Sequence, residues 1–559
     1  MTDPRTVFAG NLRFLQNRDR ELAERIAGAQ PDFSTPLCYR FLEARNGDPV
    51  PAILGSGTAR PLHSLVDPRR EGIRLVSTLG EEDFLIFLGL GGGYHIEAAL
   101  ERPETSRVII VEYGIRGLAE LLGLRDLGRI LGDSRVGILA DPPSGMLERF
   151  IPAHFLPALS GAIRVLPLRP RIDAAPLVFE TAAAEIREAV GRVSADYSVQ
   201  AHFGIRMFKN ILRNILIAET IPAEEGPAPF PRIDRALICA AGPSLNSRLA
   251  HIAESREKGG LLIAADTSLP VLLSAGLKPD ATVSIDCQHI SYRHFIPPGT
   301  KGGDPGLLFL DLTSPLGSLA GRRIFFSGGH PLADYASSWW RPFPSIDSSG
   351  GNVTYAAVSL AEFLGAGEIR LYGADFSYPQ GSTYARGTYI FPYFNMRQNR
   401  LYPLESLFSH FLYRGPLEKK NGPGGAWYYE TAALARYREA LALKGERMGA
   451  RPLPEGGFTR VPRRGLGDPR RGRAAGKNPI LPARDFLAEY RERIRALPPP
   501  REGPASAYPE KLDVGERQIL ATLLPLAAAL RRRDPGLRGA GIIEGIRDYG
   551  IAAIDRVLG

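Results

Sequence analysis

Three short polar motifs follow apolar runs in the middle of the chain, and their residue types suit phosphate and sugar chemistry. The first is Gly242-Pro243-Ser244, a sharp turn that leads into a helix beginning near Asn246. The first N–H groups of a helix lack partners and carry partial positive charge, so they suit a phosphate. The same turn also fits an ordinary connection in which Ser244 caps the helix. Both interpretations place the motif at the end of a strand.

Acidic residues end the next two apolar runs: Asp266 follows LLIAA, and Asp286 follows ATVSI. Carboxylates at strand ends accept hydrogen bonds from ribose or sugar hydroxyls, or hold Mg²⁺ against a diphosphate. Helix capping is the alternative for Asp266, because Thr267, Ser268 and Pro270 follow it. Both acids are therefore candidates for binding substrate hydroxyls, with Mg²⁺ as the alternative ligand.

The third motif is a run of small polar residues ahead of an apolar helical pattern: Ser349, Gly350, Gly351 and Asn352. The strand after that helix ends at Asp375. One Gly-rich turn is common, but two such turns beside three strand-end acids favour a single nucleotide site over coincidence.

Each motif lies between an apolar run of about four to eight residues and an amphipathic helical pattern, which is the repeating unit of a parallel α/β sheet. Ligands of such sheets bind outside the carboxyl ends of the strands. The sequence therefore predicts an α/β fold with one site at that edge of a central parallel sheet.

A Rossmann-like lobe is predicted at the N-terminus. It opens with an amphipathic helix over Val7–Ala27, and the turn GLGGGYH later joins a strand to a helix. Glu112 ends the following strand, where a ribose-binding carboxylate could lie. Close packing of strand and helix would demand the same glycines without any ligand, so occupancy of this lobe stays open.

Proline-rich and basic stretches predict the domain boundaries. The segment IPAEEGPAPFP separates an N-terminal Rossmann-like domain, 1–222, from a central glycosyltransferase-like domain, 223–460. A basic linker follows over 461–477, and helical spacing of apolar residues over 478–559 predicts a C-terminal helical bundle.

Composition limits the function classes. With 559 residues, 44% of them hydrophobic and 23% charged, the chain is typical of a soluble globular protein. No apolar run approaches the ~20 residues of a membrane span, and the N-terminus lacks a secretory apolar region, so we expect a cytoplasmic protein. The net charge of +9 comes largely from the linker, where no aromatic residues interleave, so nucleic acid is not an expected partner. Three cysteines without a C-x-x-C pair predict no disulfide framework or structural zinc.

The segment 36–457 resembles known transferase families. GPSL, the acid-ended strand, SGGN and GADFSYPQGSTYARGT look like motifs of the bacterial sialyltransferases. With LHS-x-x-DPRREG and the GLGGGYH turn ahead of them, the arrangement is similar to the motility-associated-factor (Maf) flagellin glycosyltransferases. It equally resembles the MptE-like family, named for the archaeal 6-hydroxymethylpterin diphosphokinase.

The sialyltransferase resemblance implies a CMP-activated nonulosonic acid, of the pseudaminic, legionaminic or sialic type, as donor. The Maf resemblance implies Ser/Thr hydroxyls of flagellin as acceptors, with no required cofactor. Gly242–Ser244 match the turn that holds the nucleotide, and Ser349–Gly350 match a contact to the donor phosphate. Tyr384 matches a tyrosine that hydrogen-bonds the leaving phosphate, and Tyr378 matches a second with a one-residue offset. His410 lies in the region where the family carries its general base.

Two other functions stay open. One is an ATP-dependent diphosphate transfer to a pterin, with Mg²⁺ held by Asp266 and Asp286. The other is a non-catalytic partner-binding protein that retains the fold. Asp266 stands where sialyltransferases carry Asn, which favours a hydroxyl or metal contact at that position over a phosphate contact.

Overall fold

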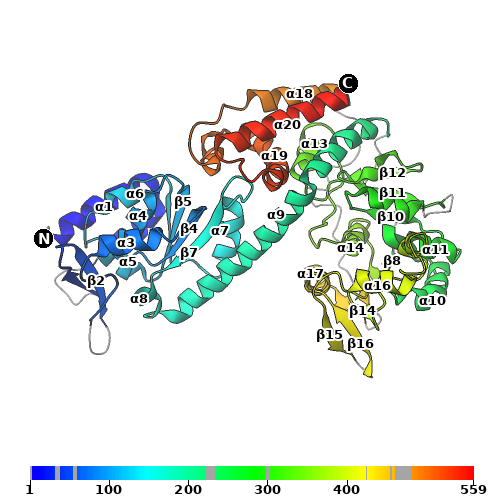
Figure 1. Cartoon of the computed structure of the whole chain (residues 1–559), viewed down its shortest axis with the longest axis horizontal. Coiled ribbons are helices and arrows are strands. Elements are labelled where there is room, and N and C mark those ends of the chain that lie inside the picture. Colours follow the sequence, from blue (N-terminus) through cyan, green and yellow to red (C-terminus); the bar gives the residue numbers. More distant parts are fainter. Residues whose placement is uncertain are drawn as a thin grey trace. The chain divides into compact units, whose positions relative to one another are not determined.

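The computed structural model describes residues 3–29, 31, 38–54, 59–221, 233–296, 302–422, 425–453, 456–459 and 481–559. They form two compact units, one of residues 1–204 with 497–549 and one of residues 205–496 with 550–559 (Figure 1). Both units are built on parallel sheets with helices, which confirms the predicted α/β fold class. The predicted boundaries at 222/223, 460/461 and 477/478, and the basic linker, lie outside the described residues. The predicted domain division therefore stays a prediction.

The first unit contains a four-stranded parallel sheet in the order β6-β5-β4-β7. Its strands are β4 (Glu82–Leu88), β5 (Arg107–Glu112), β6 (Val136–Ala140) and β7 (Ala162–Pro167). Leu85 and Phe87 of β4 join one core cluster, whereas Phe84 and Ile86 join another. Alternate side chains of a strand point to opposite faces. Both faces of this Rossmann-like sheet are therefore covered by apolar side chains.

The predicted leading helix is two helices, α1 (Pro4–Arg18) and α2 (Arg20–Gly28). Asp19 lies between them in a non-helical conformation, and its side chain accepts a hydrogen bond from the N–H of Leu22 at 2.9 Å. A single helix was the wrong prediction because Asp19 caps the second helix, a local contact that competes with continued helical pairing.

The remaining elements of the first unit flank this sheet. They are a small antiparallel sheet of β1 (Tyr39–Glu43), β2 (Pro49–Leu54) and β3 (Ala59–Pro61), and the helices α3 (Pro68–Val76), α4 (Tyr94–Leu100), α5 (Ile115–Leu121), α6 (Gly128–Leu131), α7 (Met146–His154), α8 (Arg169–Ile172) and α19 (Val514–Arg533). Helices α9 (Pro176–Glu219) and α20 (Ala540–Leu558) contribute residues to both units.

The second unit contains an eight-stranded sheet in the order β12-β11-β10-β9-β8-β13-β18-β17. The six strands from β12 to β13 in this order are parallel, and the last two are antiparallel. The strands are β8 (Arg235–Cys239), β9 (Leu261–Ala265), β10 (Ala281–Ser284), β11 (Leu307–Asp311), β12 (Arg323–Phe326), β13 (Glu368–Tyr372), β17 (Arg451–Pro452) and β18 (Gly457–Thr459).

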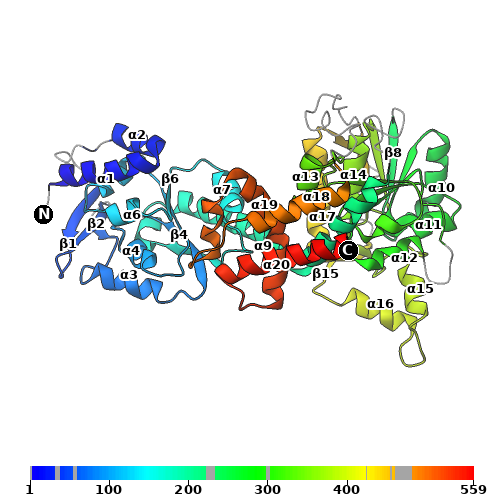
Figure 2. The ribbon, with the colours of Figure 1, turned by 90° about the horizontal axis from the view of Figure 1, so that it is seen from above.

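Helices cover this sheet on both faces. Helix α14 (Val353–Phe363) packs with Ala236 and Ile238 of β8, whereas α10 (Leu245–Glu257) and α11 (Leu269–Ser274) pack with Leu237 and Cys239. Figure 2 shows α14 and α10 on opposite sides of β8. The side chains of β8 alternate between the two cores, which is why an uninterrupted apolar run forms this strand.

The other helices and strands of the second unit surround these layers. They are α12 (Tyr292–Phe295), α13 (Pro331–Trp339), α15 (Ile390–Asn395), α16 (Leu404–Leu412), α17 (Ala432–Arg447), α18 (Ala483–Ala496), and a small sheet of β14 (Tyr378–Pro379), β16 (Trp427–Glu430) and β15 (Glu418–Asn421). The chain after residue 481 is helical, as predicted. Among the described residues, no helix has the length and apolar character required to cross a bilayer.

Candidate functional site

The topology of the second unit marks one position at the edge of its sheet. Strand β8 pairs with β9 on one side and with β13 on the other, although β13 comes last of the six parallel strands in the chain. The order of the strands therefore reverses between β8 and β13. In open α/β sheets, ligands bind outside the carboxyl ends of the strands at such a reversal. The turn after β8 is Gly242–Ser244, and the residue after the end of β13 is Gly373, two positions before Asp375.

Asp375 fills the turn after β8. Its Oδ2 accepts a hydrogen bond from the N–H of Ser244 at 3.0 Å, and the N–H of Gly242 donates to the carbonyl of Gly373 at 2.8 Å. A β-carbon on Gly242 would lie 2.1 Å from the same carboxylate oxygen. Half-buried Pro243 completes the turn. Asp375 and the carbonyl of Gly373 leave no room for a β-carbon at position 242, and nucleotide binding by this turn stays a prediction.

The prediction that the Ser244 side chain caps α10 is wrong. Ser244 occupies the N-cap position, but its backbone is helical and its side chain makes no capping hydrogen bond. A capping side chain normally requires a non-helical backbone at this residue. The hydroxyl of Ser244 is therefore free of this local role at the edge of the predicted site.

Asp266 is buried and bonded within the protein. Its Oδ1 accepts from the N–H and the hydroxyl of Thr267 at 2.6 Å and 3.0 Å, and its Oδ2 accepts from the Ser284 hydroxyl at 2.7 Å. Asp286 accepts from the N–H of Gln288 at 2.9 Å. Burial and the neighbouring charge of Asp266 raise the pKa of Asp286. The two acids lie close enough to interact, but the oxygens of Asp266 are already engaged by donors, which fits a Mg²⁺ ligand poorly.

Among the described residues, no three metal-ligating side chains gather into a group that could hold an ion. Transfer without a required metal stays a prediction, and Mg²⁺ held by Asp266 and Asp286 stays its alternative.

Asp311 is a strand-end acid that the sequence analysis did not single out. It ends β11, is buried, and accepts from the N–H and hydroxyl of Thr313 at 2.7 Å and 2.6 Å. Burial raises the pKa of Asp311 to about 6. The signal was present in the sequence, because Asp311 follows the apolar run LLFL as Asp266 and Asp286 follow theirs.

The Ser349–Asn352 segment begins α14, as predicted. Asn352 caps the helix by accepting from the N–H of Tyr355 at 2.9 Å. A β-carbon on Gly350 would lie 2.2 Å from the Tyr355 ring, and Gly351 has a positive φ of 71°. Local packing and backbone conformation therefore account for both glycines.

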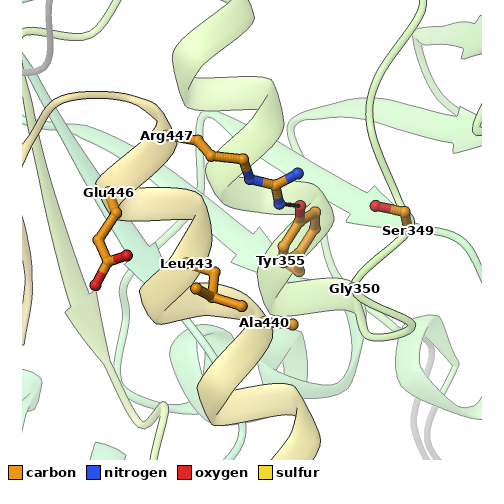
Figure 3. Close-up of a pocket in the computed structure, with 7 residues that line it drawn as sticks. All are labelled: Ser349, Gly350, Tyr355, Ala440, Leu443, Glu446 and Arg447. Carbon is orange, nitrogen blue, oxygen red and sulfur yellow. Dashed lines mark hydrogen bonds between the residues drawn. The ribbon is translucent and has the colours of Figure 1, made fainter. Parts of the chain in front are cut away.

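Ser349 and Gly350 line a cavity of about 390 Å³ between this segment and α17 (Figure 3). Arg447 of α17 donates to the hydroxyl of Tyr355 at 3.0 Å inside it. Apart from hydrogen bonds within the segment, Asp347–Asn352 bond to α14, α17 and Gly328 in the described part of the chain. The predicted phosphate-binding segment and α17 therefore line the same cavity. The sequence did not indicate that α17 lies beside this segment.

Tyr384 lies on a loop that is tied to the turn after β8. The N–H of Ala385 donates to the carbonyl of Ala241 at 2.9 Å, and the N–H of Arg386 donates to Asn246 Oδ1 at 2.8 Å. Burial raises the pKa of Tyr384 to about 12, and the neighbouring Tyr389, Tyr378 and Asp266 add to this shift. The structure therefore brings Tyr384, Tyr378 and Asp266 into one neighbourhood, with the Tyr384 phenol kept protonated.

Two histidines of the second unit, His410 and His294, differ in their exposure to solvent. His410 is exposed on α16, and its ring contacts Tyr402 with a centroid distance of 5.4 Å. His294 on α12 is buried, and its ring lies 4.7 Å from that of Tyr389. Its Nδ1 has no hydrogen-bond partner among the described residues. His294 also lowers the pKa of Asp286. The role of His410 as base stays a prediction, and His294 lies close enough to Asp286 to act on its charge.

The glycine-rich turn of the first unit is filled by its own side chains. His63 Nε2 accepts from the N–H of Gly92 at 2.9 Å, and Glu112 accepts from the N–H of Leu90 at 2.9 Å. Arg171 forms an ion pair with Glu112 at 2.8 Å, and both side chains are buried. These contacts use the donors and the carboxylate that a dinucleotide would need. The packing interpretation of this turn therefore fits the geometry better than ligand binding.

Known proteins are similar to parts of this chain, and one family model matches within the second unit. A model of the family described as 6-hydroxymethylpterin diphosphokinase MptE-like matches residues 209–381. Two proteins of Treponema pallidum (strain Nichols), both described as uncharacterized, are also similar. The first is 43% identical over 105 residues, which are 19% of this chain and 37% of that protein. The second is 32% identical over 175 residues, which are 31% of this chain and 80% of that protein.

The solved structure of the MAf glycosyltransferase from Magnetospirillum magneticum AMB-1 matches with a TM-score of 0.60 and 15% identity. The match covers 99% of this chain and 95% of that one. The chain thus belongs to the same family as the second Treponema pallidum protein, carries an MptE-like domain over residues 209–381, and shares the fold of the Maf glycosyltransferase.

Proposed function

We propose that this protein is a glycosyltransferase that moves a nonulosonic acid from a CMP donor to Ser/Thr hydroxyls of flagellin. The observation that carries the proposal is the neighbourhood at the strand reversal, where the loop of Tyr384 is tied to the Gly242–Ser244 turn. The fold shared with a Maf glycosyltransferase over 99% of the chain supports the same reading. A two-unit protein also offers more surface for a protein acceptor than a small-molecule enzyme needs.

In the proposed reaction, the acceptor oxygen attacks the anomeric carbon of the sugar, and the bond from that carbon to the phosphate oxygen breaks. The departing CMP takes the bonding electrons, and the acceptor proton passes to a base. Tyr384 donates a hydrogen bond from its phenol to the leaving phosphate. A tyrosine is already protonated at neutral pH, and burial raises the pKa of Tyr384 further, to about 12. A donor aimed at charge that develops in the transition state lowers the barrier more than it strengthens substrate binding.

Direct transfer tests the proposal. Purified protein is mixed with the CMP-activated forms of pseudaminic, legionaminic and N-acetylneuraminic acid and with flagellin of the source organism, and intact mass spectrometry follows the flagellin. We expect a mass increase of one sugar per modified site with at least one donor. CMP at ~100 times its Kd should also add about 2.7 kcal/mol of stability in a thermal-shift assay. The proposal fails if CMP leaves the melting temperature unchanged and no donor modifies flagellin.

The MptE-like match over residues 209–381 favours a second candidate, diphosphate transfer from ATP to a hydroxymethylpterin. The engaged oxygens of Asp266 fit the required Mg²⁺ poorly. Release of AMP from ATP in the presence of Mg²⁺ and 6-hydroxymethyl-7,8-dihydropterin would favour this function, and release only of CMP from a CMP-sugar would favour the first.

A further inference from the structure

Three arginines beside the predicted site stack on aromatic rings. The guanidinium of Arg293 lies 4.2 Å from the centroid of the Tyr393 ring, and that of Arg397 lies 4.1 Å from the same centroid. Arg414 lies 4.1 Å from the centroid of Phe411. We call these five side chains the arginine–aromatic cluster. Stacking holds each guanidinium plane in place while its N–H edge remains able to bind an oxyanion.

The positive charge of this cluster is not neutralised within the described part of the chain. No carboxylate there lies within ion-pair distance of Arg293, Arg397 or Arg414, whereas Arg171 and Arg235 each pair with a glutamate. Arg293 Nη1 is buried and has no hydrogen-bond partner. A buried donor without an acceptor is unfavourable, and more so when it is charged. An acceptor oxygen from a bound molecule would remove this cost.

The cluster belongs to the same neighbourhood as the strand-end acids. Burial raises the pKa of Tyr389; the charges of Arg293 and Arg414 oppose this rise, and that of Asp286 adds to it. Arg414 also lowers the pKa of Tyr384, the residue predicted to contact the leaving phosphate. The Phe411 ring that carries Arg414 lies 6.0 Å from the Tyr384 ring. Arg414 is thus linked to Tyr384 through the Phe411 ring, and Arg293 directly precedes His294, whose ring lies 4.7 Å from that of Tyr389.

We propose that the arginine–aromatic cluster binds an oxyanion of the substrate, with Arg293 as its central donor. This inference rests on the proposed function, in which the donor is an anion. The strand-end acids alone would repel such a donor, so its binding requires positive charge nearby. The oxyanion is either the phosphate of the nucleotide or the carboxylate of an acidic sugar, because both accept paired N–H groups of arginine. Arg397 and Arg414, which are more exposed, complete the electropositive side of the site.

Equilibrium binding of four probes tests this assignment in the full-length protein: cytidine, CMP, CMP-N-acetylneuraminic acid and free N-acetylneuraminic acid. Titration calorimetry compares the wild type with Arg293→Gln and Arg397→Gln. Arg322→Gln is the matched control, because Arg322 is exposed and precedes β12 at the amino end of that strand, the opposite edge of the sheet. Circular dichroism and melting temperature verify that each variant is folded.

We expect Arg293→Gln to weaken binding of an anionic probe about tenfold or more, and Arg397→Gln to weaken it less. If the phosphate is bound, CMP loses affinity while cytidine does not. If the carboxylate is bound, CMP affinity is kept while CMP-N-acetylneuraminic acid and the free sugar acid lose affinity. The control should bind all probes like the wild type.

Two results would overturn the inference, and they differ from each other. If the wild type binds CMP or its sugar conjugate and Arg293→Gln binds every probe equally well, the cluster is not an anion site although the proposed function survives. If the folded wild type binds none of the four probes, the proposed function fails and the assignment fails with it. A folded Arg293→Lys variant that restores affinity would show that charge suffices, whereas failure to restore it would show that paired N–H donation is needed.

Discussion

Replacing Gly242 by alanine should destabilise the second unit, because the turn after β8 leaves no room for a β-carbon. The added atom would lie 2.1 Å from Asp375 Oδ2 and 2.5 Å from the carbonyl oxygen of Gly373. Both oxygens are held by hydrogen bonds. The carbonyl of Gly373 accepts from the N–H of Gly242 at 2.8 Å, and Asp375 accepts from the N–H of Ser244 at 3.0 Å.

The expected cost follows from these contacts. Overpacking a well-filled position typically costs about 1–3 kcal/mol, and for large domains each kcal/mol lowers the melting temperature by roughly 2–4 °C. We therefore expect Gly242→Ala to melt roughly 2–12 °C below the wild type. The carboxylate is one of two obstacles, so the same substitution should cost less in an Asp375→Ala background, with a coupling of about 0.5 kcal/mol or more.

Scanning calorimetry of the wild type, Gly242→Ala, Asp375→Ala and the double variant measures this coupling. Gly415→Ala is the control, because nothing lies within 4 Å of a β-carbon built at Gly415. It should melt within about 2 °C of the wild type. A Gly242→Ala protein that melts like this control, or effects that add without coupling, would refute the conclusion that Asp375 fills the turn.

Three further predictions concern the chemistry of the site. Tyr384→Phe should lower kcat for transfer by roughly 10²–10³-fold with little change in donor KM. Steady-state kinetics measure this, with half-buried Tyr197→Phe of α9 as the control, and a kcat within about twofold of the wild type would assign Tyr384 a structural role. The folded-state pKa of Asp311 is raised to about 6, so its contribution to stability is present below its ordinary pKa and is lost as pH rises through 6. Urea unfolding should therefore show that the wild type loses up to about 3 kcal/mol of stability relative to Asp311→Asn between pH 4 and 7, and an equal pH dependence of the two proteins would contradict the shift. Transfer should survive EDTA if Asp266 serves hydroxyls, and Mg²⁺-restored loss of activity would support the diphosphokinase.

Local pattern was sufficient for the elements that carry the site. Apolar runs ending in Gly or Asp predicted the strand ends at β8, β9, β10 and β13, because both faces of a parallel sheet are buried and its strands must be apolar throughout. The rule that ligands bind at the carboxyl ends of such strands then grouped Gly242–Ser244 with Asp375. The same local reasoning failed at Asp19 and at Ser244, where capping geometry depends on backbone angles that residue type does not determine.

Only the tertiary structure decided what these residues touch. Ser244 and Asp375 are separated by 131 positions, yet the Asp375 carboxylate accepts a hydrogen bond from the N–H of Ser244. His63 fills the glycine-rich turn of the first unit, and Arg293 meets Tyr393 across 100 residues of chain. Propensity and periodicity describe neighbours within a few residues, so they cannot reveal which distant side chain completes a turn or leaves a charge unpaired. Those pairings arise from packing, which depends on the whole fold.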